Sequence, residues 1–335
     1  MISNCFYYGV YSPKGFYSLA SRPNFSAPKE YIVKGYSLST KQKLFDCIKN
    51  ELDKRGQSYI DFRADERSIG IYSSDAGFRI IDGTYETLTY SAELFDLNND
   101  EETEKVKECI LHREEAVKRA QRFLCACRCI INDMERIETA DMDFGKINRY
   151  SSRLWTSTGG KLKGSIGTEH KRFVTCFTPD GVELNMEAFD IYCDNITVIC
   201  DRTGACARRI VDRVRRYALS AGYDVISCLC PLNIEKGAEH LIIPELGYGI
   251  FVCKHFHKAD FEKCRKVSSK RFMIESEAET KRRMDFSFKA YKRLMQEVFS
   301  SLETVSLYDK ALENHIVRNF QEESIGNVLQ KLFAR

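Results

Sequence analysis

The sequence has no strong charge of one sign, no long apolar run and no pair of cysteines at the C-x-x-C spacing. A formal net charge of +3 over 335 residues argues neither for nor against a nucleic-acid partner. No apolar run approaches the roughly eighteen residues that span a bilayer, so we expect no membrane partner. The missing cysteine spacing argues against the common zinc modules.

Fourteen cysteines are scattered along the chain, and residues 1–5 do not begin a secretory leader, which has a basic start and then an apolar run. We therefore expect a cytoplasmic protein whose thiols are reduced and act as small core residues. Cys253, His255 and His257 alternate, so a strand would point them to one face. This pattern alone is a poor zinc signature, and we expect no metal site.

The same pattern occurs twice, at a constant shift of 166 residues (15 to 181, 33 to 199, 56 to 222). A repeat of this length indicates two copies of one domain. We expect the first copy at 1–155, a Gly- and Lys-rich linker at 156–168 and the second copy at 169–335. The matching segments are Ser12-Pro13-Lys14-Gly15 with Thr178-Pro179-Asp180-Gly181, Tyr31-Ile32-Val33 with Thr197-Val198-Ile199, and Gly56 with Gly222.

Each copy reads as a short strand, a loop, a helix and further strands, which is typical of an α/β fold with a mainly parallel sheet. The first strand is 31–33, and apolar residues at helical spacing follow over 43–52. Charged stretches with helical periodicity, 100–138 and 275–314, end the two copies. We expect these helical tails to pack against their own sheet or against the other copy.

The loop of the first copy has the frame of a phosphate-binding loop, G-x-x-x-x-G-K-[ST]. Lys41 keeps the cation of that frame, and Asp82 ends an apolar strand, where such folds place a carboxylate beside Mg²⁺. Thr40 replaces the second glycine, and Gln42 replaces the hydroxyl ligand of Mg²⁺. The candidate nucleotide-binding residues are Gly35, Ser39, Thr40, Lys41, Gln42 and Asp82. A competing interpretation makes Lys41 a solvated lysine and Asp82 a turn residue.

The loop of the second copy keeps fewer residues of the phosphate-binding frame than the first loop does. The shift of 166 places Ala207 at the lysine position, and further along the chain a shift that has grown to 170 (77 to 247) places Val252 where Asp82 stood, so we expect no Mg²⁺-dependent phosphoryl transfer here. Arg202 and Arg209 lie near the start of the expected helix, a place that favours anions. They are equally explained as a charged helix face. The residues of this degenerate loop are Asp201, Gly204, Cys206, Ala207 and Arg208.

With these segments and Ile243-Pro244-Glu245-Leu246, the chain resembles an uncharacterised bacterial family of tandem P-loop ATPases, with degenerate Walker motifs in both copies. The resemblance implies two tandem P-loop NTPase-like domains and ATP as the cofactor. ATP binding carries over to the first copy alone, through Lys41 and Asp82, and Mg²⁺ carries over poorly.

The function expected from these losses is that of a pseudo-ATPase, a scaffold or nucleotide sensor with a protein partner that the sequence does not identify. Catalysis requires the loop glycine, the hydroxyl and the lysine together. One alternative is a slow ATPase or nucleotide kinase that uses Lys41. A second alternative is a nucleic-acid-associated protein that uses Arg202, Arg208, Arg209 and the basic linker.

Overall fold

The structure, a computed structural model, describes residues 5–20, 25–85, 92–97, 104–255, 261, 264–274, 278–315 and 321–333. The chain forms two compact units. Unit 1 comprises 1–121, 177–181 and 298–335, and unit 2 comprises 122–176 and 182–297. No described helix combines the length and the apolar character that crossing a bilayer requires.

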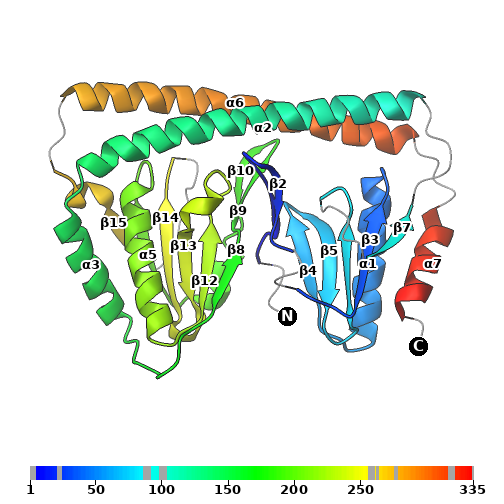
Figure 1. Ribbon diagram of the computed structural model, residues 1–335, viewed down its shortest axis with the longest axis horizontal. Helices are drawn as coiled ribbons and strands as arrows, with labels where there is room; N and C mark the ends of the chain where they lie inside the picture. The colour runs from blue at the N-terminus through cyan, green and yellow to red at the C-terminus, as the bar shows by residue number, and fades with distance from the viewer. Residues whose placement is uncertain are drawn as a thin grey trace. The chain divides into compact units, whose positions relative to one another are not determined.

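Unit 1 is built on a five-stranded mixed sheet in the order β4-β5-β6-β3-β7 (Figure 1). β3 pairs in parallel with β6 and with β7, whereas β4, β5 and β6 form an antiparallel meander. The carboxyl ends of β3 and β6 therefore meet at one edge, where α1 begins. The elements are β3 (Lys29–Lys34), α1 (Leu38–Lys54), β4 (Ile60–Ala64), β5 (Arg67–Ser73), β6 (Phe78–Asp82) and β7 (Glu93–Asp96).

Unit 2 contains a six-stranded mixed sheet in the order β15-β11-β14-β13-β12-β8. β11 pairs in parallel with β14 and β15, and β12, β13 and β14 are antiparallel neighbours. β8 is an additional parallel edge strand beside β12. The elements are β8 (Glu169–Arg172), α4 (Glu187–Tyr192), β11 (Asn195–Cys200), α5 (Ala205–Ser220), β12 (Val225–Leu229), β13 (Ala238–Ile243), β14 (Tyr248–Cys253) and β15 (Cys264–Ser268), with short 3₁₀ turns at Ile234–Lys236, Pro244–Leu246 and Ser269–Phe272.

The same order of elements runs through both halves of the chain. A hairpin precedes each central strand: β1 (Gly9–Ser12) with β2 (Gly15–Ser18), and β9 (Thr175–Thr178) with β10 (Gly181–Leu184). Gly15 and Gly181 both have positive φ, +93° and +134°, at these turns. Gly56 and Gly222 follow α1 and α5 with φ of +65° and +94°. The repeated glycines thus stand where the backbone enters a region that L side chains avoid.

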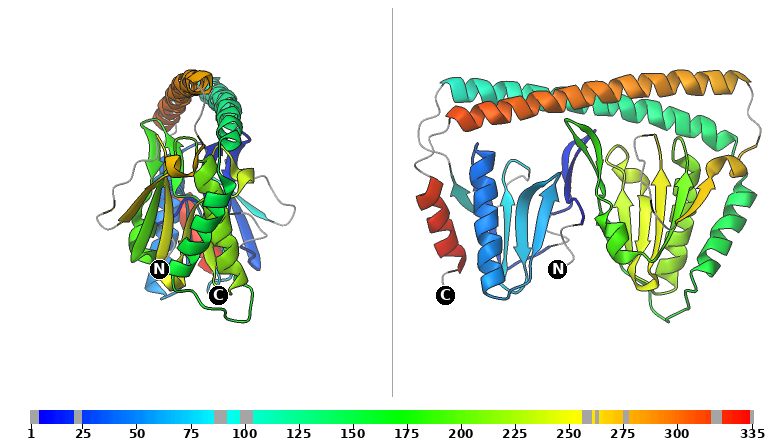
Figure 2. Two further views of the ribbon diagram at one scale, coloured as in Figure 1. Left: turned by 90° about the vertical axis from the view of Figure 1, so that its left-hand side faces the viewer. Right: turned by 180° about the vertical axis from the view of Figure 1, so that it is seen from behind.

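Two long helices, α2 (Glu104–Ala140) and α6 (Ala278–His315), each begin in one unit and end in the other. A shorter helix follows each: α3 (Phe144–Ser157) after α2, and α7 (Gln321–Phe333) after α6. In unit 2, α3 packs on α5, and in unit 1, α7 packs beside α1 (Figure 2). The tail of each half of the chain therefore covers a sheet formed by the other half.

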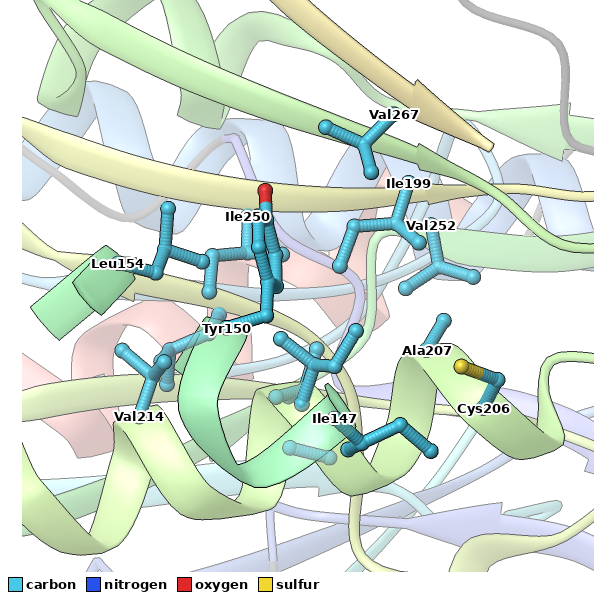
Figure 3. Packing of buried hydrophobic residues seen from close by; sticks show 14 of the residues in the cluster. Ile147, Tyr150, Leu154, Ile199, Cys206, Ala207, Val214, Ile250, Val252 and Val267 are labelled. Atoms are coloured by element: carbon cyan, nitrogen blue, oxygen red, sulfur yellow. The ribbon is translucent and has the colours of Figure 1, made fainter. Parts of the chain in front are cut away.

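Apolar residues account for this packing. In unit 2, Ile147, Tyr150 and Leu154 of α3 meet Val214 of α5 and Ile250 of β14 in one buried cluster (Figure 3). In unit 1, the cluster joins residues of α1 and β3 to Ile325, Val328 and Leu332 of α7. Apolar spacing of three and four residues on the terminal helices is what allows each of them to close a core.

Three sequence expectations need adjustment. The central strands β3 and β11 pair in parallel with both neighbours, as expected, but the sheets are mixed, because β4, β5 and β6 and their counterparts β12, β13 and β14 are antiparallel meanders. Residues 156–168, expected to link the two copies, lie inside unit 2, where Lys163 N donates to Ala221 O and Gly167 N to Leu219 O. The helix of the first copy starts at Leu38, earlier than expected, since Ser37 caps it by accepting from Thr40 N.

Candidate functional site

The loop between β3 and α1 is only three residues long, Gly35 to Ser37, because the four positions from Ser39 to Gln42 already belong to the helix. Gly35 follows β3 directly and lies against Leu97. Thr40, expected to disturb a glycine position, is an ordinary buried helical residue whose hydroxyl donates to Ser37 Oγ at 2.7 Å. The structure therefore has a capped helix N-terminus where the sequence frame predicted a long phosphate-binding loop.

Lys41 and Asp82 meet at the edge where β6 ends and α1 begins. Lys41 Nζ lies 2.8 Å from Asp82 Oδ2 and 3.1 Å from Oδ1, and both side chains are buried. Lys41 Nζ also donates to Thr84 Oγ1 at 3.0 Å, and Thr84 N donates to Asp82 Oδ1. The lysine is thus a buried, fully engaged cation rather than a solvated one.

The N-terminus of α1 holds a carboxylate from α6. Glu313 Oε1 accepts from Ser39 N at 2.9 Å, and Glu313 Oε2 accepts from Ser39 Oγ at 2.6 Å and from Ser37 Oγ at 2.9 Å. Free backbone N–H groups and the helix dipole make this position attractive to anions such as phosphate. In this chain, Glu313 supplies the anion.

Gln42 does not face the position where a metal ligand is expected. Its amide donates to Asp46 Oδ1 and Ser68 Oγ, and its Oε1 accepts from Ser68 N at 3.0 Å. These bonds tie α1 to β5. The sequence residues thus divide into a group at the helix N-terminus (Ser39, Lys41, Asp82) and a residue that serves packing (Gln42).

The loop of unit 2, Asp201 to Gly204, contains its own anion. Asp201 Oδ2 accepts from Ala207 N at 2.8 Å, so the carboxylate caps α5 from within the loop. Gly204 has φ of +89°, and a Cβ there would lie 2.3 Å from Lys254 Cε, which explains why this glycine remains. Cys206 and Ala207 point into the apolar core (Figure 3).

Glu138 of α2 lies beside Asp201 and accepts a hydrogen bond from Thr203 Oγ1. Burial raises the pKa of Glu138 from 4.5 to about 8, and the negative charge of Asp201 adds to this rise. Glu138 therefore holds its proton near neutral pH, beside the side chain of Asp201. Sequence reasoning missed Glu138, as it missed Glu313.

Glu138 and Glu313 occupy matching places. The shift of 166 relates Ser37 to Thr203, and both hydroxyls donate to a glutamate near the end of a long helix. Between the long helices the shift has grown to 175, which relates Glu138 to Glu313. A search for that larger shift is the signal that could have identified the two glutamates.

The basic residues of the second loop are engaged by other side chains. Arg208 makes two hydrogen bonds to Glu135, of 3.0 and 2.9 Å, and Lys236 contacts the same carboxylate. Burial alone would raise the pKa of Glu135, but these hydrogen bonds and cations lower it. Arg202 pairs with Asp285, and Arg209 lies over the ring of Phe144. These contacts separate the three arginines that the sequence placed in one cluster.

A pocket of about 620 Å³ opens in unit 2 where β11, β14 and β15 end. In open α/β sheets, ligands bind outside the carboxyl ends of parallel strands. Asp201 and Glu138 line this pocket together with Cys200, Cys253, Met273 and Met284. Two carboxyls thus line the pocket at the carboxyl ends of these parallel strands.

Within the residues that the structure describes, no three His, Cys, Asp or Glu side chains are grouped so that they could hold a metal ion. Cys253 ends β14, whereas His257 lies outside the described residues. All fourteen cysteines lie within the described residues, and no disulfide joins any two of them. No known protein family matches the chain, and no curated protein or solved structure is significantly similar to it.

Proposed function

We propose that this chain is a pseudo-ATPase, a degenerate relative of tandem P-loop ATPases that acts as a scaffold or sensor for a protein partner instead of turning over nucleotide. The observation that carries the proposal is the carboxylate of Glu313 at the N-terminus of α1. A phosphoryl group bound there would meet a negative charge already in place.

The surrounding charges support the same conclusion. Phosphoryl transfer needs a lysine that is free to contact the transferring group and a carboxylate that is free to hold Mg²⁺. In unit 1 these two groups neutralise each other, as Lys41 and Asp82. In unit 2 the corresponding residues are Ala207, which is buried, and Val252, which is also buried. Each loop retains the form of a strand-to-helix junction while its charges serve internal contacts.

The test is ATP turnover by the full chain with Mg²⁺, measured for the natural sequence and for Lys41→Ala. We expect both to release phosphate at the background rate. Turnover by the natural chain that Lys41→Ala abolishes would contradict the proposal and favour the slow ATPase or kinase.

Glu313→Ala tests whether this carboxylate blocks an anion site at the N-terminus of α1. Removal of this carboxylate leaves Ser39 N and the two serine hydroxyls open to another anion, so we expect the variant to gain millimolar binding of inorganic phosphate. Glu303→Ala is the matched control, because Glu303 is an exposed residue of the same helix. Equal phosphate binding by the two variants would show that Glu313 does not block an anion site.

A further inference from the structure

We propose that the pocket of unit 2 binds a small zwitterion, whose ammonium or guanidinium end meets Asp201 and Glu138 and whose anionic end faces the lysines at the pocket mouth. The proposal concerns unit 2 and does not depend on whether unit 1 binds nucleotide. L-Arginine represents this class of ligand.

The first argument is the state of Asp201. Its side chain is almost completely buried, with 2% exposure, and it lines the pocket. Oδ2 accepts from Ala207 N, whereas Oδ1 has no hydrogen-bond partner among the described residues other than the carboxyl of Glu138 beside it. A buried carboxylate with an unsatisfied oxygen is costly unless a cation or a proton compensates it. In the absence of ligand the proton of Glu138 is the only such compensation among the described residues, so this oxygen marks where a donor from a ligand would bind in its place.

The second argument is that the nearby protein cations are committed elsewhere. Lys254 lines the same pocket, but its ammonium contacts Glu239. Burial would lower the pKa of Lys254, yet Glu239 raises it, so the ammonium stays charged and paired. Arg208 is held by Glu135 in the same way. The carboxyl pair of Asp201 and Glu138 is left to attract a cation from outside.

The third argument is the charge layout of the pocket. Ile137, Met273 and Met284 supply an apolar wall, and Lys270 and Lys281 are exposed residues of the lining. The lining also includes Asp141 and the ion pair of Arg202 with Asp285, whose charges offset each other. A ligand that fits this order has a cationic head, a short aliphatic arm and an anionic tail. This arrangement of charges disfavours a nucleotide, because phosphate groups beside Asp201 and Glu138 would face two carboxyls.

Binding also has a defined proton balance. Without ligand, the proton held by Glu138 neutralises part of the charge of the pair. A ligand cation takes over that role, so the proton leaves to the buffer. We expect arginine binding near neutral pH to release up to one proton, measured by calorimetry in buffers with different ionisation enthalpies.

The experiment is calorimetric titration of the full chain with L-arginine, with L-citrulline, which replaces the guanidinium by a neutral group of similar shape, and with agmatine, which lacks the carboxylate. We expect arginine to bind with saturable heat and citrulline to bind at least about tenfold more weakly, or ~1.4 kcal/mol. Arginine heat that is absent at millimolar concentration, or citrulline that binds as tightly, would overturn the proposal.

Variants locate the two ends of the ligand. Asp201→Asn keeps an oxygen that can accept from Ala207 N, so α5 stays capped while the charge is lost, and we expect arginine affinity to fall by about tenfold or more. Asp190→Asn, at an exposed residue of α4, is the matched control. If Asp201→Asn does not fold, Glu138→Gln tests the same pair. Lys281→Ala should weaken arginine but leave agmatine unchanged, and an equal effect on both would refute the placement of the anionic end.

Discussion

The two strand-to-helix loops of this chain satisfy the same need with carboxylates from different places. In unit 1, the anion at the N-terminus of α1 comes from Glu313, distant in sequence. In unit 2, Asp201 of the loop itself caps α5, and Glu138 of the long helix lies beside it. The comparison teaches that the demand of a helix N-terminus for negative charge can be met by carboxylates of the protein itself, from near or far in the sequence. The first solution leaves one carboxylate engaged, whereas the second leaves a carboxyl pair lining a pocket.

Substitutions in the buried ion pairs should produce the largest difference in stability between the two units. Lys41→Met removes the only cation that contacts Asp82 among the described ion pairs, so we expect unit 1 to lose about 3–5 kcal/mol. Arg208→Met leaves Lys236 beside Glu135, and we expect unit 2 to lose about half as much. Native-state amide hydrogen exchange of α1 and α5 measures the two effects.

A double variant sharpens this result. Lys41→Met with Asp82→Leu removes both charges, and replacement of a buried pair by apolar residues is often neutral. We therefore expect the double variant to regain most of the stability that Lys41→Met loses. Equal losses in the single and double variants would show that the ion pair itself is not the cause.

The pH dependence of unit 2 is a test of intermediate size. Because burial and Asp201 raise the pKa of Glu138 to about 8 from its ordinary 4.5, the folded state holds a proton that the unfolded state releases between these values. The contribution of this group is therefore fully present below about pH 4.5 and is lost as the pH rises toward 8, by at most about 1.4 kcal/mol per pH unit.

Glu138→Gln carries a neutral group at every pH, so we expect its stability to change less across this range. Denaturant unfolding at pH 5, 6, 7 and 8, monitored through exchange in α5, provides the measurement. If unit 2 of the natural chain becomes more stable as the pH rises over this range, Glu138 does not hold this proton in the folded state.

The matched glycines after α1 and α5 should show the smallest difference. Both have positive φ, so an alanine costs about 1 kcal/mol at either position. A Cβ at Gly56 would meet no atom within 4 Å, whereas a Cβ at Gly222 would lie 2.8 Å from Ser165 O. We expect Gly222→Ala to destabilise its unit by roughly 1 kcal/mol more than Gly56→Ala does, as measured by thermal unfolding. Equal destabilisation by the two variants would mean that the segment around Ser165 moves away from the new Cβ without loss of stability.

The sequence was informative where a local pattern determines the backbone. The repeated glycines at 15, 56, 181 and 222 all have positive φ, and the strand-loop-helix order holds in both halves. The sequence assigned Lys41 and Asp82 to one nucleotide site. The two side chains are in contact, because parallel neighbours bring strand ends to one edge, whereas nucleotide binding there stays a prediction. Local spacing also suggested a long loop, but Ser37 begins the helix early, and side-chain capping decided the boundary.

The remainder depended on contacts between distant residues. Glu313 binds residues more than 270 positions earlier, and Glu138 lies 65 positions from Thr203. Both glutamates belong to long charged helices in which every turn carries similar residues, so no spacing within either helix distinguishes them, and only the larger shift of 175 residues relates them. The partners of Arg202 and Arg208 were hidden for the same reason, and three arginines that are close in sequence point to three different groups.

The path of the chain limits how it can be divided. Residues 1–155 contain Ser37 and Ser39 but lack the glutamate that they bind, and they lack α7, which buries Ile325 and Val328 against α1. A protein cut at the boundary of the repeat would therefore yield two incomplete products, each with an exposed apolar core and an open helix end. Because each long helix begins in one unit and ends in the other, neither half of the chain contains all the residues of one unit.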